Sequence, residues 1–174
     1  MRRLVWLLLL PAVLSCAYAS IQREPGLPKA EPDPSAQVVV LVPVDAAFGG
    51  KVYPGTGRFV AEHTLAALRH RFPLAQLLDE HDEHAALARA RQDSIAFLIS
   101  PVILHWEDRA TNWSGMRDKV QIELRLLRVE PPELVQSVLF EARNNSFTLF
   151  DDKPEVLLDE DFDNAVLALV VEPQ

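Results

Sequence analysis

Residues 103–124 read Ile-Leu-His-Trp-Glu-Asp-Arg-Ala-Thr-Asn-Trp-Ser-Gly-Met-Arg-Asp-Lys-Val-Gln-Ile-Glu-Leu. The first part is apolar, the middle is polar and contains Trp113, and apolar and polar side chains alternate from Val120 onwards. A period of two is typical of a strand with one buried face, because successive side chains point to opposite faces. We therefore predict two strands joined by a polar loop, and a sheet as the framework of the fold.

Neighbouring segments extend this sheet. Residues 95–104 are rich in Ile, Val and Phe and predict a central strand, in which Pro101 requires a bulge or an unpaired edge position. Residues 134–142, after a turn at 130–133, predict the hairpin partner of the alternating strand. At Leu126-Leu127 the alternation slips, so we expect a bulge or a change of face there.

The earlier part of the domain alternates strands with helices. Residues 37–42 form a continuous β-branched run, which predicts a strand buried on both faces. Two helices are expected next, one with Ala61, Leu65, Leu68 and Phe72 on one face and an Ala-rich one over residues 83–91, with a short strand between them at 74–78.

A terminal helix completes the pattern, with Pro154 in its first turn and Leu158, Phe162, Val166 and Leu169 on one face. This order of elements predicts an α/β domain with a mixed sheet of about five strands and three helices. Its early half is parallel, and its late half is an antiparallel hairpin followed by the terminal helix.

The N-terminal residues have the pattern of an export signal. Arg2 and Arg3 precede an apolar run that is too short to span a bilayer. Residues 13–16, Val-Leu-Ser-Cys, resemble the bacterial lipobox, and Cys16 is the one cysteine of the chain. We predict a signal peptide over residues 1–15 and lipidation of Cys16; the alternative is an ordinary signal peptide cleaved near residues 17–19.

Four prolines and one glycine mark the segment after the lipobox, which we expect to be a semi-extended tether over residues 16–36. Residues 37–174 then form a single domain, since 49% of the chain is hydrophobic and its 174 residues suit one core.

The chain carries 17 basic and 25 acidic residues, a net charge of −8. Loss of Arg2 and Arg3 with the signal peptide makes the balance more negative still. This charge disfavours nucleic acid and broad electrostatic binding to anionic lipid headgroups, so a charged partner is expected to be basic.

Residues 43–57 join a predicted strand to a predicted helix and contain several glycines. A nucleotide-binding loop is not expected, because Gly50-Lys51 is followed by Val52, and Val60 stands where a dinucleotide fingerprint needs a small residue. Turn glycines, with Thr56 as an N-cap, explain the segment.

Two histidines, His81 and His84, flank Asp82-Glu83 at a predicted turn. They lack the spacing of a zinc-binding helix, and Asp79 or Asp82 as a helix cap explains the acidic residues. No metal and no cofactor are therefore predicted.

The chain resembles a family of small bacterial envelope lipoproteins of unknown function. The resemblance rests on residues 51–58, Lys-Val-Tyr-Pro-Gly-Thr-Gly-Arg, on residues 103–115, and on the amphipathic strand that follows. Its size, tether and element order also resemble curli secretion and Pel polysaccharide export lipoproteins, at the level of architecture. The resemblance implies a lipid-anchored domain on the periplasmic side and brings no catalytic mechanism.

The polar loop is the predicted partner-binding site, through Glu107, Asp108, Arg109 and Trp113, because Trp and Arg are common anchors at interfaces. The competing interpretation is structural: either acid pairs with Arg109 or Arg117, and Trp113 packs on the end of the sheet. For Trp106, beside the buried strand, we expect a core position.

These observations predict an outer-membrane-anchored periplasmic lipoprotein that is a binding or assembly module rather than an enzyme. Its expected partners are the membrane, through the lipid anchor, an envelope protein and, as an open alternative, further copies of itself. The alternative function is a periplasmic enzyme or metal-binding protein that uses His105, Asp108 and the turn from His81 to His84.

Overall fold

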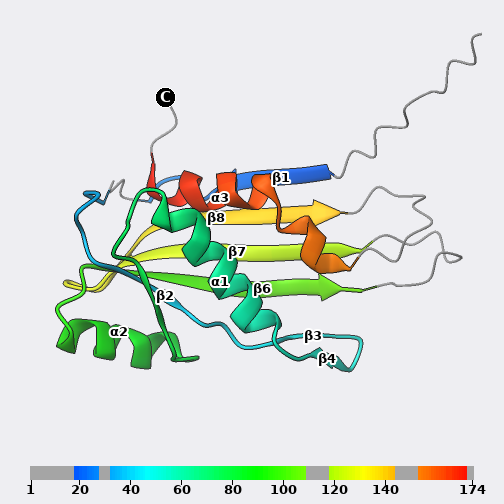
Figure 1. Cartoon of the computed structure of the whole chain (residues 1–174), viewed down its shortest axis with the longest axis horizontal. Helices are drawn as coiled ribbons and strands as arrows, with labels where there is room; N and C mark the ends of the chain where they lie inside the picture. Colours follow the sequence, from blue (N-terminus) through cyan, green and yellow to red (C-terminus); the bar gives the residue numbers. More distant parts are fainter. Residues whose placement is uncertain (1–17, 28–31, 109–117, 144–152, 172–174) are drawn as a thin grey trace, which may run out of the picture.

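The structure is a computed structural model that describes residues 18–27, 32–108, 118–143 and 153–171. Within these ranges the chain forms a six-stranded mixed sheet, a two-stranded ribbon, three α-helices and a short 3-10 helix (Figure 1). The elements are β1 (Tyr18–Arg23), β2 (Val38–Leu41), β3 (Ala46–Phe48), β4 (Lys51–Tyr53), α1 (Thr56–Arg69), β5 (Gln76–Leu78), α2 (Glu83–Gln92), β6 (Phe97–Glu107), β7 (Lys119–Arg128), β8 (Glu133–Arg143), η1 (Pro154–Leu157) and α3 (Glu160–Val170).

The sheet has the order β1-β8-β7-β6-β2-β5. β2 pairs in parallel with both β5 and β6. The other three pairs, β6 with β7, β7 with β8 and β8 with β1, are antiparallel. All four residues of β2 are buried, as the β-branched run predicts for a strand with neighbours on both sides and on both faces. The predicted α/β class, mixed sheet and terminal helix are confirmed.

Helices lie on opposite faces of the sheet. α1 and α3 cover one face, and α2 packs on the other against β2 and β6 (Figure 1). From β2 the chain crosses outwards to β5 through α1 and then back over β2 to β6 through α2, so crossovers of one hand place the two helices on opposite sides. The two adjacent residues Leu126 and Leu127 are therefore both buried, one in each of the two cores.

The irregularities predicted in the strands are present, with one shift of position. The register between β7 and β8 changes between Leu126 and Leu127, as expected. Pro101 itself pairs with Leu124 and lies beyond Ile99, the last residue of β6 that pairs with β2. Its missing N–H therefore costs no ladder bond on that side, and the bulge in β6 falls later, between residues 103 and 105.

The tether predicted over residues 16–36 is wrong for its first part. Residues 18–23 form β1, which pairs along its whole length with β8 and is the sixth strand of the sheet. They precede Pro25, so every residue of this stretch keeps the backbone N–H that a ladder needs.

The C-terminal helix packs as its periodicity predicts. Leu158, Phe162, Val166 and Leu169 are all buried, and the rings of Phe140 and Phe162 meet edge to face with centroids 5.2 Å apart. The predicted start of the helix is wrong, because Pro154 begins the separate turn η1 and Asp159 caps α3. No helix in the described ranges has the length and apolar character needed to cross a bilayer.

Candidate functional site

The end of β6 gathers three polar residues that the sequence singled out. Nε2 of His105 lies 3.2 Å from Oε2 of Glu107, whose residue is only 7% exposed. Asp108 follows, and its Oδ2 lies 3.6 Å from Nζ of Lys51. The Lys51–Asp108 contact thus joins segments that are distant in the sequence, whereas His105 and Glu107 contact each other within β6.

Lys51 belongs to a ribbon that the sequence did not predict. Residues 43–57 were expected to be a loop, but β3 and β4 pair within it and pack beside β6. The ring of Phe48 meets that of His105 edge to face at 4.6 Å, and Nζ of Lys51 lies 4.5 Å from the ring centroid of Tyr53. The ribbon therefore holds the polar end of β6 with both ring and charge contacts.

The sequence did not predict that Phe48 and Lys51 contact His105 and Asp108 at the end of β6. Strands of three residues are too short to produce a readable alternation, so periodicity could not find them. One signal was available: residues 51–58 and 103–115 are two of the segments that carry the family resemblance. The described parts of these two segments lie side by side in the fold.

Several predicted site residues lie outside the described residues, namely Cys16, Arg109 and Trp113. The expected ion pairs of the loop with Arg109 or Arg117 fall there too. Trp106 is 1% exposed in the main core, which confirms its predicted position.

A row of paired residues crosses the same end of the sheet. Tyr18 pairs with Arg143, Arg143 with Lys119, and Lys119 with Glu107. Directly paired residues share a face of the sheet, and here it is the face opposite α1 and α3. We call these four residues the terminal row; it lies at the right-hand end of Figure 1, where β1 begins and β6 and β8 end.

Glu141 organises the polar side chains next to the terminal row. It accepts hydrogen bonds from Gln121 at 2.5 Å and from Arg143 at 2.6 Å, and Nζ of Lys119 lies 3.8 Å away. Burial by itself raises the pKa of Glu141, but the hydrogen bonds from Gln121 and Arg143 and the charge of Lys119 outweigh it and hold the pKa below 4.5.

The face that carries the terminal row has little helical cover. Among the described elements α2 is the helix on this side, where it packs on the other end of the sheet and pairs with β7 through Glu83 and Arg125 at 2.9 Å. Towards the terminal row the side chains hydrogen-bond to one another instead, as Ser137 does to Glu123 at 2.8 Å. Polar side chains of neighbouring strands hydrogen-bond to one another on this face. Such a face is suited to a polar, hydrated interface that forms reversibly.

A cavity of about 390 Å³ lies at the carboxyl ends of β2 and β5, beside the start of α1. Gly57 donates its N–H to Oδ1 of Asp45 at 2.9 Å, so a carboxylate of the chain already occupies the position where a helix N-terminus binds an anion. The sequence of residues 43–60 likewise lacks a nucleotide-binding motif. The lining residues are Val42, Pro43, Val44, Asp45, Gly55, Arg58, Asp79 and His81.

Thr56 is not the N-cap that the sequence predicted. Gly55 takes the cap position with a φ of 87°, a value that favours glycine. The hydroxyl of Thr56 instead accepts from the backbone N–H of Ala46 at 2.8 Å and donates to the carbonyl of Tyr53 at 2.8 Å. It thereby fixes the ribbon to α1.

The residues of the alternative metal or enzyme site have separate roles. Nδ1 of His81 hydrogen-bonds to the carbonyl of Val42 at 2.9 Å beside the cavity, and Asp82 caps α2 by accepting from the N–H of Ala85 at 2.8 Å. His105 contacts Phe48 at the end of β6. Within the described ranges no three His, Cys, Asp or Glu residues are grouped to hold a metal ion.

The sequence matches the model of one protein family over most of its length. Residues 32–166, most of the chain, match the family described as a domain of unknown function, DUF4823. The chain belongs to this family. The match begins after β1 and includes the ribbon, the terminal residues of β6 and the whole of β7 and β8. A search of curated proteins gives no match.

Solved structures with a similar fold come from bacterial proteins. The PelC dodecamer from Paraburkholderia phytofirmans superposes with a TM-score of 0.66 at 14% identity, over 90% of this chain and 100% of PelC. Protein XCC0632 from Xanthomonas campestris, of family DUF330, gives a TM-score of 0.52 at 13% identity, over 84% of this chain and 86% of that one. At these identities the likeness shows the fold alone. PelC thus shares the fold of this chain, in agreement with the architectural resemblance.

Proposed function

We propose that this DUF4823 protein is a lipoprotein of the bacterial cell envelope. It is anchored through Cys16 on the periplasmic side of the outer membrane and is a binding or assembly module without catalytic activity. The observation that carries the proposal is the pairing of Tyr18 with Arg143, which makes the chain directly after Cys16 a strand of the sheet. A mature chain that begins at Cys16 would therefore keep the whole of β1.

The chemistry at the polar end of the sheet supports binding. His105 contacts Glu107, Lys51 contacts Asp108, and Glu141 accepts hydrogen bonds from its neighbours, so these polar groups restrict one another's positions. Fixed polar groups on a sheet face serve recognition well, because little side-chain freedom is lost when a partner binds. Residues 109–117 follow directly after Asp108 in the sequence, which is why we retain Arg109 and Trp113 as partner-binding residues.

Self-association is part of the proposal. PelC, whose fold this chain shares, is a dodecamer in its crystal structures. In the described sheet β1 and β5 are the outer strands, and the outer edge of a strand carries backbone groups to which a strand of another copy can bind. Native mass spectrometry of the detergent-solubilised, full-length protein measures the number of copies directly.

A pull-down from detergent-solubilised envelopes tests the binding role. Arg109→Ala and Trp113→Ala should lose the envelope partner that the wild type retains, since an interface anchor contributes about 2 kcal/mol or more, roughly a thirtyfold change in affinity. Arg89→Ala is the matched control, because Arg89 is exposed on α2 and pairs with Asp93 in the same helix. Thermal unfolding of all three variants should stay close to that of the wild type.

Two results would count against this role. Loss of the partner together with a melting temperature lowered by many degrees would show that Arg109 and Trp113 are structural. Full retention of the partner by both variants would remove the loop from the binding site.

A further inference from the structure

The distance between the anchor and the sheet is short. Ala17 alone separates Cys16 from Tyr18, the first residue of β1. An extended residue spans at most about 3.6 Å, so the Cα atoms of Cys16 and Tyr18 are no more than roughly 7 Å apart. A lipid on Cys16 would therefore hold the first residue of β1 at the membrane surface.

β1 cannot swing away from the domain to relieve this constraint. All six of its residues pair with β8, and the guanidinium of Arg23 donates to the carbonyl of Val171 after α3 at 2.7 Å. The end of the sheet that holds Tyr18 also holds the rest of the terminal row and, through the Lys51–Asp108 contact, the ribbon of β3 and β4. A membrane that holds the start of β1 would therefore also lie close to the terminal row and the ribbon.

The exposed side chains at this end suit a phospholipid surface. Tyr18 is 63% exposed, and the side chains of Arg143 and Lys51 are 49% and 61% exposed. Tyrosine is enriched at the level of the headgroups, and basic side chains are attracted to lipid phosphates. These basic side chains also pair with carboxylates, Arg143 with Glu141 and Lys51 with Asp108, so membrane contact at this end depends on the nearby Cys16 and the exposed Tyr18 rather than on a basic patch.

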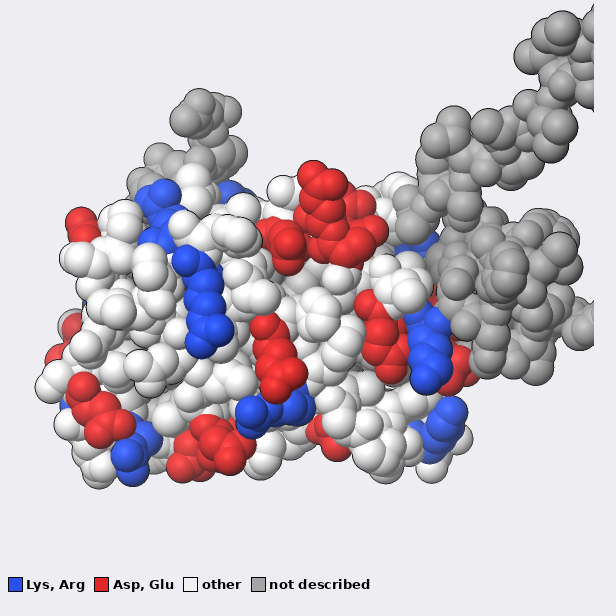
Figure 2. Space-filling model, in the orientation of Figure 1, with Lys and Arg blue, Asp and Glu red and all other residues white. Residues whose placement is uncertain are grey.

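The face covered by helices is a poor alternative for membrane contact. Its acidic side chains gather over the N-terminal end of α3 (Figure 2), where Asp159, Glu160, Asp161 and Asp163 cap and begin the helix. If the molecule lay on that face, these carboxylates would be placed against lipid phosphates, and like charges repel.

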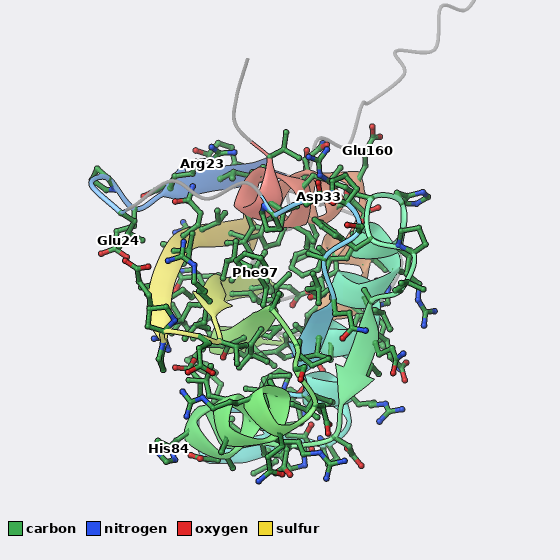
Figure 3. The ribbon with its side chains drawn as sticks, turned by 90° about the vertical axis from the view of Figure 1, so that its left-hand side faces the viewer. Arg23, Glu24, Asp33, His84, Phe97 and Glu160 are labelled. Atoms are coloured by element: carbon green, nitrogen blue, oxygen red, sulfur yellow. The ribbon has the colours of Figure 1, made fainter. Side chains whose placement is uncertain are left out.

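We propose that the domain stands end-on on the bilayer, with the terminal row and the β3–β4 ribbon against the phospholipid headgroups and the strands running away from the membrane. This inference rests on the proposed lipidation of Cys16. The opposite end of the sheet, which carries Glu24 and Phe97 (Figure 3), then faces the periplasm. The polar sheet face stands upright and is accessible from the side. Because residue 109 follows Asp108 at the membrane-facing end, the partner proposed for Arg109 and Trp113 would be an envelope protein at the membrane surface.

A fluorescence-quenching experiment tests this orientation on the full-length lipidated protein. A dye is placed on Val52→Cys, in the ribbon, or on Leu74→Cys, just before β5 at the opposite end; both native side chains are exposed apolar residues, at 58% and 63%. Each variant is reconstituted into phosphatidylcholine and phosphatidylglycerol vesicles that contain a lipid with a headgroup spin label. A third variant, Glu160→Cys, reports on the helix-covered face.

We expect strong quenching at position 52 and little at position 74, because an eleven-residue strand such as β6 separates the two ends by about 30 Å. Position 160 lies on the helix-covered face, which stands upright in the end-on orientation, so it should be quenched less than position 52. Equal quenching at the three positions, or stronger quenching at 74 or 160, would overturn the end-on orientation while leaving the anchor in place. Failure of the labelled proteins to float with vesicles, together with two dyes per chain because Cys16 is free, would overturn the lipidation and the orientation together.

Discussion

Tyr18 lies opposite Arg143 in the pairing of β1 with β8, although only Ala17 separates it from Cys16. A flexible tether of some twenty residues would let a domain move freely above the membrane. A strand that starts two residues after the proposed anchor would instead fix the height of the domain and its sheet. The proposed function and the proposed orientation both depend on this pairing.

The register of β7 can be tested with two adjacent residues. Leu124 is fully buried in the main core, so Leu124→Ala should lower the free energy of unfolding by ~2–4 kcal/mol. Glu123 lies on the other face and accepts a hydrogen bond from the buried Ser137, so Glu123→Ala should cost about 0.5–1.5 kcal/mol. Urea denaturation measures both values. Equal losses for the two variants would show that the strand phase is misassigned.

Gly57 is the point of closest approach between α1 and the chain that follows β2. A Cβ built on Gly57 would lie 2.1 Å from the carbonyl oxygen of Pro43, a backbone atom that cannot rotate away. Gly57→Ala should therefore destabilise the fold by roughly 1–3 kcal/mol, although alanine is the better helix former. Differential scanning calorimetry provides the measurement.

The control for that variant is the next residue of α1. Arg58 is exposed, and its ion pairs with Glu62 and Asp79 are on the surface, so Arg58→Ala should change stability by no more than about 0.5 kcal/mol. A Gly57→Ala protein as stable as this control would mean that α1 does not approach Pro43 so closely.

Glu141 predicts a dependence of stability on pH. Its pKa in the folded chain lies below the ordinary 4.5, so the ionised form is stabilised by folding, and this contribution is present above pH 4.5 and lost as the pH falls through the folded pKa. Glu141→Gln should thus be less stable than the wild type near neutral pH, and the difference should shrink in acid. Denaturation curves from neutral pH into the acid range test it; a difference that stays constant below 4.5 would contradict the assigned contacts.

The sequence predicts the elements whose burial produces a clear period. β6, β7 and β8 were found because long strands in the middle of a sheet alternate or are wholly apolar, and α2 begins at Glu83 where its cap was expected. The buried face of α3 was found for the same reason: its apolar side chains recur at helical spacing.

Elements and contacts that depend on tertiary partners were not predicted. β1 reads Tyr-Ala-Ser-Ile-Gln-Arg, a polar edge strand without a strong period, and only pairing with β8 makes it a strand. The contact between Lys51 and Asp108 likewise joins two segments whose proximity follows from the β3–β4 ribbon. Residue type was sufficient to select Glu107 and Asp108 as site candidates. The sequence did not show that His105 and Lys51 are their partners.

The most direct test of the central claim is the intact mass of the protein extracted from membranes of cells that make the full-length chain. Lipidation predicts a mature chain that begins at Cys16 and carries a diacylglyceryl group with an added N-acyl chain, and a Cys16→Ala variant that leaves the membrane fraction after a salt wash. Two or more acyl chains, at about 0.8 kcal/mol per buried methylene, are sufficient to hold the domain there. An unmodified chain that begins after residue 17, 18 or 19, or a Cys16→Ala protein that still sediments with membranes, would contradict the account.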